Sequence, residues 1–339
     1  MSLQAWFNRL WYERPRPPPW LVPLSGVYAA AAALRRAAYR RGWRVAARLS
    51  RPVVVVGNLS AGGTGKTPLV GWIAARLAAN GRHPGIVTRG YRGSARGARL
   101  IGPGDDPAVV GDEPLLLARR TGVPVAIGRA RPAAARLLIG AGCDVILSDD
   151  GLQHYALARD CEIAVIDGVR RFGNRRLLPA GPLREPVRRL ASVDAVVVNG
   201  GTPAGGEFAM RLTAASAVSL RGGAVKPLRA FAGTAVHALA GIAHPERFFA
   251  MLRVLHIEVI AHALDDHARL GAGDIRFADQ KPVLMTEKDA VKCRDWADDR
   301  HWCVPVDVQF AADDAHALVG IILRRIAAHQ RRDGEVQRG

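Results

Sequence analysis

The chain has 339 residues, 49% of them hydrophobic, so it is long enough for two domains and can bury a substantial core. Its formal net charge of +18 comes mostly from arginine and favours a phosphate-rich partner, which leaves nucleic acid, anionic lipid and phosphorylated substrates open. The four cysteines show no C-x-x-C spacing, no signal peptide is evident, and no apolar run approaches the roughly 20 residues that span a bilayer. These features argue against a disulfide scaffold, a zinc site, a transmembrane protein and a largely disordered chain.

Residues 1–50 differ in character from the rest. Tryptophans alternate with arginines before a proline run at 17–19, and a helix is predicted from about Leu24 to Leu49. On that helix Arg36, Arg40, Arg44 and Arg48 fall on one i, i+4 stripe, and Tyr28, Ala31, Leu34 and Ala38 fall on another. One interpretation is an interfacial membrane anchor, with indole rings at headgroup depth and arginines facing anionic lipid. The alternative is a helix packed on the main domain with a solvated basic face.

The region 53–68 carries the strongest motif in the chain. Four valines at 53–56 predict a strand buried on both faces, and a glycine-rich turn then leads into a helix that begins near Lys66. This is the context of a phosphate-binding loop, in which backbone N–H groups and a lysine bind phosphates and a hydroxyl binds Mg²⁺. The predicted ATP-binding residues are Gly62, Gly63, Thr64, Gly65, Lys66 and Thr67. Ser60 stands where the usual pattern has a glycine, and the alternative is a glycine-rich turn without a ligand.

Further strands are predicted at 85–88, 123–127, 144–150, 163–167 and 195–199, with helices between them. This alternation predicts an α/β fold with a mostly parallel, doubly wound sheet. Asp149 and Asp150 end an apolar strand, where a P-loop site places a carboxylate near Mg²⁺. Asp112 and Glu113 open a helix, and they either cap it or serve the nucleophile and the metal. Arg131, after another strand, either binds a phosphate or is solvated.

The predicted organisation has four parts. An N-terminal membrane-interacting segment covers 1–50, and a P-loop kinase domain covers 51–205. A glycine-rich linker covers 206–230, and a smaller α/β domain covers 231–330, ending in a helix from about 315 to 329.

Several motifs together resemble one family. They are 57–58 with 62–68, 89–91, 111–114, 149–154, 178–185, 240–242 with 245–248, 266–267 and 286–290. This combination resembles tetraacyldisaccharide 4′-kinase, the lipid A 4′-kinase of Gram-negative bacteria, across nearly the whole chain. The family's pair Asp266-His267 follows Leu264 and Asp265 here, where the family usually has an aromatic residue and a proline.

The resemblance implies ATP-dependent phosphorylation of the 4′-hydroxyl of a tetraacyldisaccharide 1-phosphate, with ATP and Mg²⁺ as cofactors and lipid IVA as product. It also implies a peripheral protein at the cytoplasmic face of the bacterial inner membrane, whose partners are the lipid substrate and the membrane surface. No nucleic-acid partner and no obligate protein partner is expected. The open alternatives are another P-loop small-molecule kinase or ATP-dependent ligase, and, from charge alone, a nucleic-acid-associated ATPase.

The resemblance also assigns roles to residues. Asp112 and His267 form a dyad that takes the proton from the sugar hydroxyl, and Lys66 acts on the phosphates. Thr67 and Glu113, with Asp149 or Asp150, make up the metal environment. The residues expected to line the site or position the acceptor are Tyr91, Arg131, Gln153, His154, Arg184 and Glu185.

Overall fold

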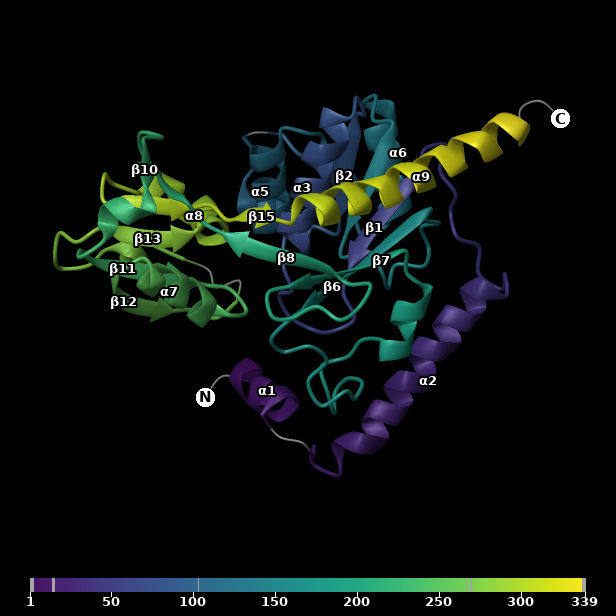
Figure 1. The fold of residues 1–339 in the computed structure, drawn as a ribbon, viewed down its shortest axis with the longest axis horizontal. Coiled ribbons are helices and arrows are strands. Elements are labelled where there is room, and N and C mark those ends of the chain that lie inside the picture. The colour runs from purple at the N-terminus through teal and green to yellow at the C-terminus, as the bar shows by residue number, and fades with distance from the viewer. Residues whose placement is uncertain (1–2, 14–15, 103, 267, 269, 337–339) are drawn as a thin grey trace.

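The structure is a computed structural model that describes residues 3–13, 16–102, 104–266, 268 and 270–336. It contains two β-sheets side by side, and two N-terminal helices lie below the larger one (Figure 1). The four cysteines are free thiols, as their spacing predicts.

The larger sheet has nine strands in the order β15-β8-β7-β6-β1-β5-β2-β4-β3. The seven from β8 to β4 are parallel, and only the edge strands β15 and β3 run antiparallel to their neighbours. The strands are β1 (Val53–Gly57), β2 (Pro84–Thr88), β3 (Arg99–Leu100), β4 (Val125–Ile127), β5 (Val145–Asp149), β6 (Cys161–Asp167), β7 (Ala195–Asn199), β8 (Phe208–Thr213) and β15 (Asp307–Gln309). The predicted mostly parallel sheet is confirmed.

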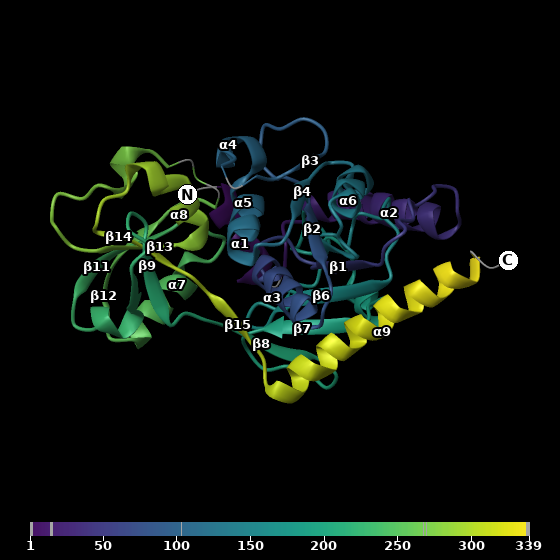
Figure 2. The ribbon, with the colours of Figure 1, turned by 90° about the horizontal axis from the view of Figure 1, so that it is seen from above.

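Both faces of this sheet are covered, because alternate valines of β1 belong to different cores. Val54 and Val56 pack with α3 (Lys66–Ala79), α5 (Asp112–Thr121) and α9 (Ala312–Val336). Val53 and Val55 pack with α6 (Arg131–Gly140) and with the segment around Leu183. The short α4 (Pro107–Val110) precedes α5. The sheet is therefore doubly wound, and Figure 2 shows α9 running along one side of it.

The smaller sheet has six strands in the order β10-β9-β14-β13-β11-β12. They are β9 (Ser216–Ser219), β10 (Val225–Pro227), β11 (Ala235–Ala240), β12 (Glu258–Ala263), β13 (Val283–Thr286) and β14 (His301–Val304). Its helices are α7 (Pro245–Val254) and α8 (Glu287–Cys293), and short 3₁₀ helices lie at Val187–Ser192, Leu228–Phe231, Ala272–Ile275 and Arg294–Trp296. A second α/β unit with its own core is confirmed.

The predicted boundaries of the second unit need correction. Within the expected linker 206–230, β8 belongs to the larger sheet and β9 and β10 to the smaller one. The expected domain 231–330 is also too long at its end, because β15 pairs with β8 and α9 returns to the larger sheet. Leu318, Ile322 and Ile326 form an i, i+4, i+8 stripe that is buried in the core of that sheet. Two antiparallel strands, β8 and β15, thus connect the two units (Figure 1).

The N-terminal segment forms two helices, α1 (Leu3–Tyr12) and α2 (Leu21–Arg40). The predicted helix from Leu24 to Leu49 is too long, because α2 ends at Arg40 and Gly42 has φ +76°. Arg44 and Arg48 therefore do not continue the predicted helical stripe of arginines. No helix in the described part of the chain is long and apolar enough to cross a membrane.

Candidate active site

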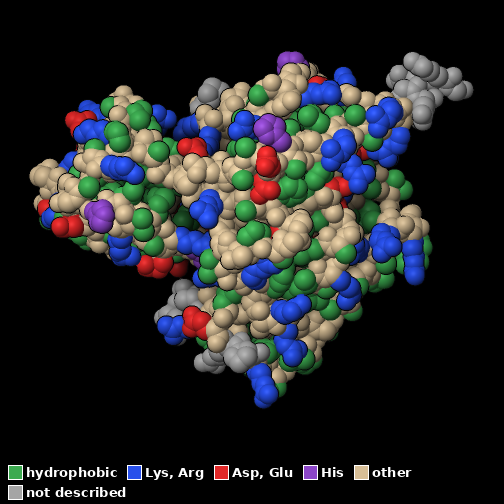
Figure 3. All heavy atoms as spheres, in the orientation of Figure 1, with side chains coloured by type: hydrophobic (Ala, Val, Ile, Leu, Met, Phe, Trp, Pro, Cys, Tyr) green, Lys and Arg blue, Asp and Glu red, His purple; other side chains and the backbone are tan. Residues whose placement is uncertain are grey.

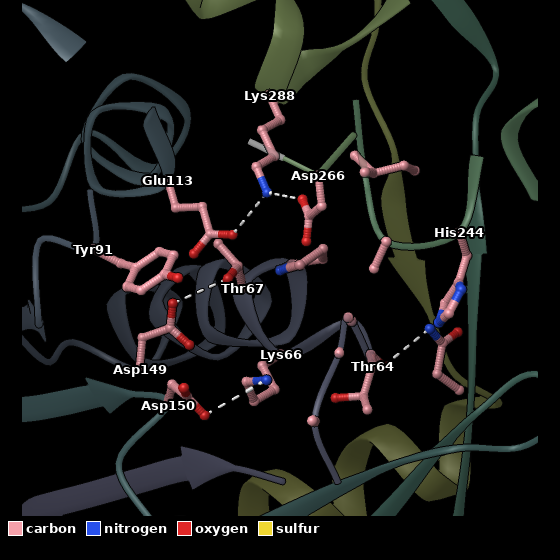
Figure 4. Close-up of a pocket in the computed structure, with 18 of the residues that line it drawn as sticks. Thr64, Lys66, Thr67, Tyr91, Glu113, Asp149, Asp150, His244, Asp266 and Lys288 are labelled. Atoms are coloured by element: carbon pink, nitrogen blue, oxygen red, sulfur yellow. Dashed lines mark hydrogen bonds and ion pairs between the residues drawn. The ribbon is translucent and has the colours of Figure 1, made fainter. Parts of the chain in front are cut away.

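A cleft of about 1700 Å³ lies between the carboxyl edge of the larger sheet and the second unit. Residues 61–68 form one wall, and Phe248 and Met251 of α7 and Lys288 of α8 contribute to the opposite wall. Figure 4 shows the side chains that converge there. The cleft occupies the position where open parallel sheets bind ligands, outside the carboxyl ends of the strands.

The phosphate-binding loop has the backbone that its glycines predict. Gly65 has φ +90°, and an added Cβ would lie 2.6 Å from the Asn199 Nδ2 atom, so both conformation and space require glycine. Asn199 at the end of β7 donates a hydrogen bond to the Thr64 carbonyl over 3.1 Å, which joins the loop to β7. Helix α3 begins at Lys66, so its N-terminal N–H groups lie at the cleft, in the arrangement by which helix N-termini bind phosphates.

Asp149 and Thr67 meet as the P-loop motif predicts. The Thr67 hydroxyl donates to Asp149 Oδ2 over 3.0 Å, while the buried Oδ1 has no hydrogen-bond partner among the described residues. Burial, with the nearby Glu113 carboxylate, raises the pKa of Asp149 to about 6 in spite of Lys66. The Asp149 carboxylate thus has one oxygen without a partner among the described residues, and burial destabilises its charged form. Both features fit a bound cation, which would neutralise the carboxylate.

These residues fit Mg²⁺ as nucleotide enzymes bind it. Mg²⁺ keeps several water ligands and takes one or two protein oxygens together with substrate phosphates. No group of three or more His, Cys, Asp or Glu able to hold a metal occurs in the described ranges, and such a group is not needed for this mode of binding. Thr67 and Asp149 would therefore supply the protein part of such a site, with Glu113 close by (Figure 4).

Asp150 has different neighbours from Asp149. Its carboxylate accepts two hydrogen bonds of 3.1 Å from Arg184 and lies 3.5 Å from the Lys66 Nζ atom. Burial alone would raise the pKa of Asp150, but Lys66 and Arg184 outweigh it and hold the pKa below the ordinary value. Arg131 donates to the main-chain carbonyls of Asp149 and Asp150 over 2.8 Å each. Asp150 thus contacts cations, and its expected place beside Mg²⁺ stays a prediction.

The carboxylates of α5 contact lysines of α8. Lys288 Nζ lies 2.7 Å from Asp266 Oδ1 and 3.3 Å from Glu113 Oε1, so it bridges the two units across the cleft (Figure 4). Asp112 is buried, and its Oδ2 atom lies 3.6 Å from Lys292 Nζ. His267, the other member of the expected dyad, lies outside the described residues.

Of the expected lining residues, Tyr91, Arg131, Gln153, His154 and Arg184 border the cleft, and Glu185 lies behind it. Burial, followed by Arg131 and Arg159, lowers the pKa of His154 to about 4, so its ring is neutral at pH 7.

Gln153 and Glu185 serve a supporting network. Gln153 Nε2 donates to the Asn58 carbonyl over 3.0 Å and to Glu185 Oε2 over 3.1 Å. Glu185 is buried, accepts from the Tyr155 hydroxyl, and has Arg189 within 3.9 Å. This network fixes the backbone at Asn58, just before the P-loop.

Sequence reasoning missed several cleft residues. Asn199, His244, Arg247 and Lys288 border the cleft, and Asp167 accepts a 2.5 Å hydrogen bond from Arg247 at its edge. A signal for two of them was present, because Asp167 and Asn199 end apolar strands of the parallel sheet just as Asp149 does. The rule that selected Asp149 would have selected them too.

Comparison with known proteins identifies the family. The sequence profile described as tetraacyldisaccharide-1-P 4′-kinase matches residues 18–327. The chain belongs to this family. The tetraacyldisaccharide 4′-kinase of Nitrosococcus oceani is 52% identical over 317 residues, covering 93% of each chain. That of Alkalilimnicola ehrlichii is 54% identical over 307 residues, covering 87% of this chain and 90% of its own.

The family's fold has also been seen in a crystal. A structure of LpxK from Aquifex aeolicus in complex with ATP matches with a TM-score of 0.77 and 26% sequence identity. The match covers 90% of this chain and 98% of the Aquifex chain, so it includes both units. The resemblance stated from the motifs is therefore confirmed, and so is the kinase fold.

Proposed function

We propose that this chain transfers the γ-phosphate of ATP to the 4′-hydroxyl of a tetraacyldisaccharide 1-phosphate, forming lipid IVA in lipid A biosynthesis. Membership of the tetraacyldisaccharide 4′-kinase family supports this activity over nearly the whole chain. Within the structure, the single observation that carries it is the Thr67–Asp149 hydrogen bond beside Lys66 at the start of α3. This arrangement is the phosphate and metal end of a P-loop phosphotransferase.

The geometry supports the following roles at the phosphates. The backbone of residues 62–67 and the Lys66 ammonium bind the triphosphate, and the lysine neutralises charge that grows during transfer. Thr67 and Asp149 would hold Mg²⁺, which when bound neutralises the β- and γ-phosphate oxygens. Arg184 keeps Asp150 against Lys66 and so restrains the direction of the lysine side chain.

The acceptor side needs a base, because a sugar hydroxyl is a poor nucleophile. We assign that role to the dyad Asp112 and His267. Lys288 supports the assignment, since it contacts Glu113 and Asp266, which are the chain neighbours of the two dyad residues. A base contributes typically about 10² to 10⁴-fold in rate.

A lipid acceptor resides in a membrane, so the enzyme needs a surface that binds the membrane. Helix α2 has such a surface. Trp20, Leu24, Val27 and Leu34 are 60, 51, 70 and 64% exposed, and their spacing of four, three and seven places them on one stripe. Lys and Arg side chains recur with hydrophobic ones over this part of the molecule (Figure 3). We therefore place the protein peripherally at the cytoplasmic face of the inner membrane, with this exposed stripe of α2 in the interface.

The packed side of helix α2 agrees with the second interpretation of its sequence, and the exposed stripe supports the membrane interpretation proposed here. One side packs on the main body through Ser25 and Tyr28, while the exposed stripe remains free of those contacts.

The decisive assay is transfer of labelled γ-phosphate from ATP to tetraacyldisaccharide 1-phosphate in mixed micelles. We expect a product phosphorylated at the 4′ position, formed only when ATP, Mg²⁺ and acceptor are all present. Transfer to small soluble alcohols or sugars with no preference for the lipid would instead indicate a general P-loop small-molecule kinase.

A further inference from the structure

The segment 177–184 lies between the N-terminal helices and the P-loop, and it contacts both. Its N-terminal part is held by α1 and α2. The Ser25 hydroxyl donates to the Leu177 carbonyl over 2.8 Å, and Trp11 Nε1 donates to the Pro179 carbonyl over 2.9 Å. Ala180 is buried together with Leu10 and Leu21, so this contact has an apolar core as well.

The other end of the same segment is bonded to the P-loop itself. The Ala61 amide donates to the Pro182 carbonyl over 2.7 Å, and the Arg184 amide donates to the Leu59 carbonyl over 2.6 Å. An isolated β-bridge joins Ser60 and Leu183. Residues 182–184 therefore lie alongside residues 59–61, at the start of the phosphate-binding loop, and are hydrogen-bonded to them.

Arg184 is where the two sets of contacts meet. Its main-chain carbonyl accepts the Tyr28 hydroxyl of α2 over 3.2 Å, while its guanidinium holds Asp150, which lies 3.5 Å from Lys66 Nζ. Only one residue separates the membrane-facing helix from the ion pair that directs the catalytic lysine.

We propose that Ser25 and Tyr28 are positioning residues, which act through the segment 177–184 and Arg184 to set the geometry of the P-loop. This inference rests on the proposed function, because it links the helix assigned to the lipid surface with the site assigned to ATP. A shift of α2 moves the Arg184 carbonyl and, through Asp150, the Lys66 ammonium. The position of the helix and the rate of phosphoryl transfer are then coupled.

The test uses variants that remove one hydroxyl each, Ser25→Ala and Tyr28→Phe, and their combination. Tyr39→Phe is the matched control, because Tyr39 is on the same helix but its ring packs against Tyr155, 6.1 Å away between centroids. We expect the double variant to lose kcat by about three- to tenfold, the effect of one or two ordinary hydrogen bonds. The KM for ATP, the melting temperature and vesicle binding should change little, and the control should match the wild type.

Two further measurements separate positioning from a structural role. In an Arg184→Ala background the two hydroxyl changes should add almost nothing, because they act through that residue. Amide hydrogen exchange at Ala61 and Arg184 should accelerate in the double variant, since these amides bond the segment to the P-loop.

Several outcomes overturn the proposal. They are an unchanged kcat in the double variant, full additivity with Arg184→Ala, or an equal loss in Tyr39→Phe. The exchange measurement needs no acceptor lipid, so unchanged exchange at Ala61 and Arg184 overturns the coupling by itself. Failure of the wild type to phosphorylate the lipid would overturn the proposed function instead.

Discussion

The buried carboxylate Asp149 gives a prediction about stability as well as catalysis. Its pKa is raised from 3.8 to about 6, and the residue is 3% exposed. At 1.36 kcal/mol per pKa unit, the difference between these two pKa values means that the charged form costs the folded protein about 3 kcal/mol. Asp149→Asn removes the charge and keeps an oxygen for the Thr67 hydroxyl. We therefore expect the variant to be more stable than the wild type at pH 8 without Mg²⁺, yet inactive.

The pH dependence has a definite sign. Because the folded pKa lies above the unfolded one, the cost is absent below about pH 4, grows between pH 4 and 6, and is fully present above pH 6. The stability gain of Asp149→Asn should therefore vanish as the pH falls from 6 to 4. A thermal shift of several degrees at pH 8 is expected, since 1 kcal/mol corresponds to about 2 to 4 °C in chains of 150–250 residues.

Asp150→Asn is a matched control, for which the expected change in stability has the opposite sign. The pKa of Asp150 is held below its ordinary value by Lys66 and Arg184, so its charge stabilises the fold above its unfolded pKa. The asparagine variant should be destabilised at pH 8, and the difference should shrink as the pH falls below about 4. Asparagine tolerates the positive φ of 49° at this position, so backbone strain does not confuse the comparison.

Differential scanning fluorimetry from pH 4 to 8, with and without Mg²⁺ and nucleotide, measures all three proteins. Mg²⁺ with nucleotide should stabilise the wild type and should stabilise Asp149→Asn much less. The reasoning fails if Asp149→Asn is no more stable at pH 8, if its gain persists at pH 4, or if both variants shift in the same direction.

Three other predictions concern chemistry and membrane binding. Lys66→Ala should abolish phosphoryl transfer and leave the circular dichroism spectrum intact, and near-normal turnover would refute the P-loop assignment. Trp20→Ser with Val27→Ser should weaken binding to anionic vesicles and raise KM for the lipid far more than KM for ATP, whereas high salt should release only part of the wild type; unchanged sedimentation would place the anchor elsewhere. Asp112→Ala and His267→Ala should each lower kcat by about 10² to 10⁴-fold with ATP affinity retained, and the double variant should be scarcely worse than the poorer single one. Full additivity in that cycle would argue against a dyad.

The sheet and the phosphate end of the site were predictable because short-range patterns specify them. Val53–Val56 are buried on both faces, and the glycines fix the loop that follows, so the neighbourhood of Lys66 needs no distant information. Asp149 was found by one further rule, that parallel strands end at a common edge. Asp167 and Asn199 satisfy the same rule and were overlooked, which shows that the signal was present in the sequence.

The boundary between the two units was harder to predict from the sequence. The apolar stripe of α9 shows that the last helix must cover a core, but both sheets offer one. The choice depends on β15, a strand of three residues whose pairing with β8 has no pattern of its own. A contact between elements nearly 100 residues apart in the chain is decided by packing, which single-sequence periodicity does not encode.

Tyr28 shows what periodicity does and does not capture. It was assigned to an apolar stripe with Leu34, yet the structure leaves Leu34 64% exposed and turns the Tyr28 hydroxyl to the Arg184 carbonyl. A phenylalanine would serve an apolar stripe as well, so the hydroxyl itself was the only sign of a polar partner. That partner is 156 residues away in a segment without regular structure, where no helix or strand rule predicts orientation. The residues that link α2 to the P-loop are thus specified by tertiary hydrogen bonds, while the P-loop itself is specified by local backbone geometry.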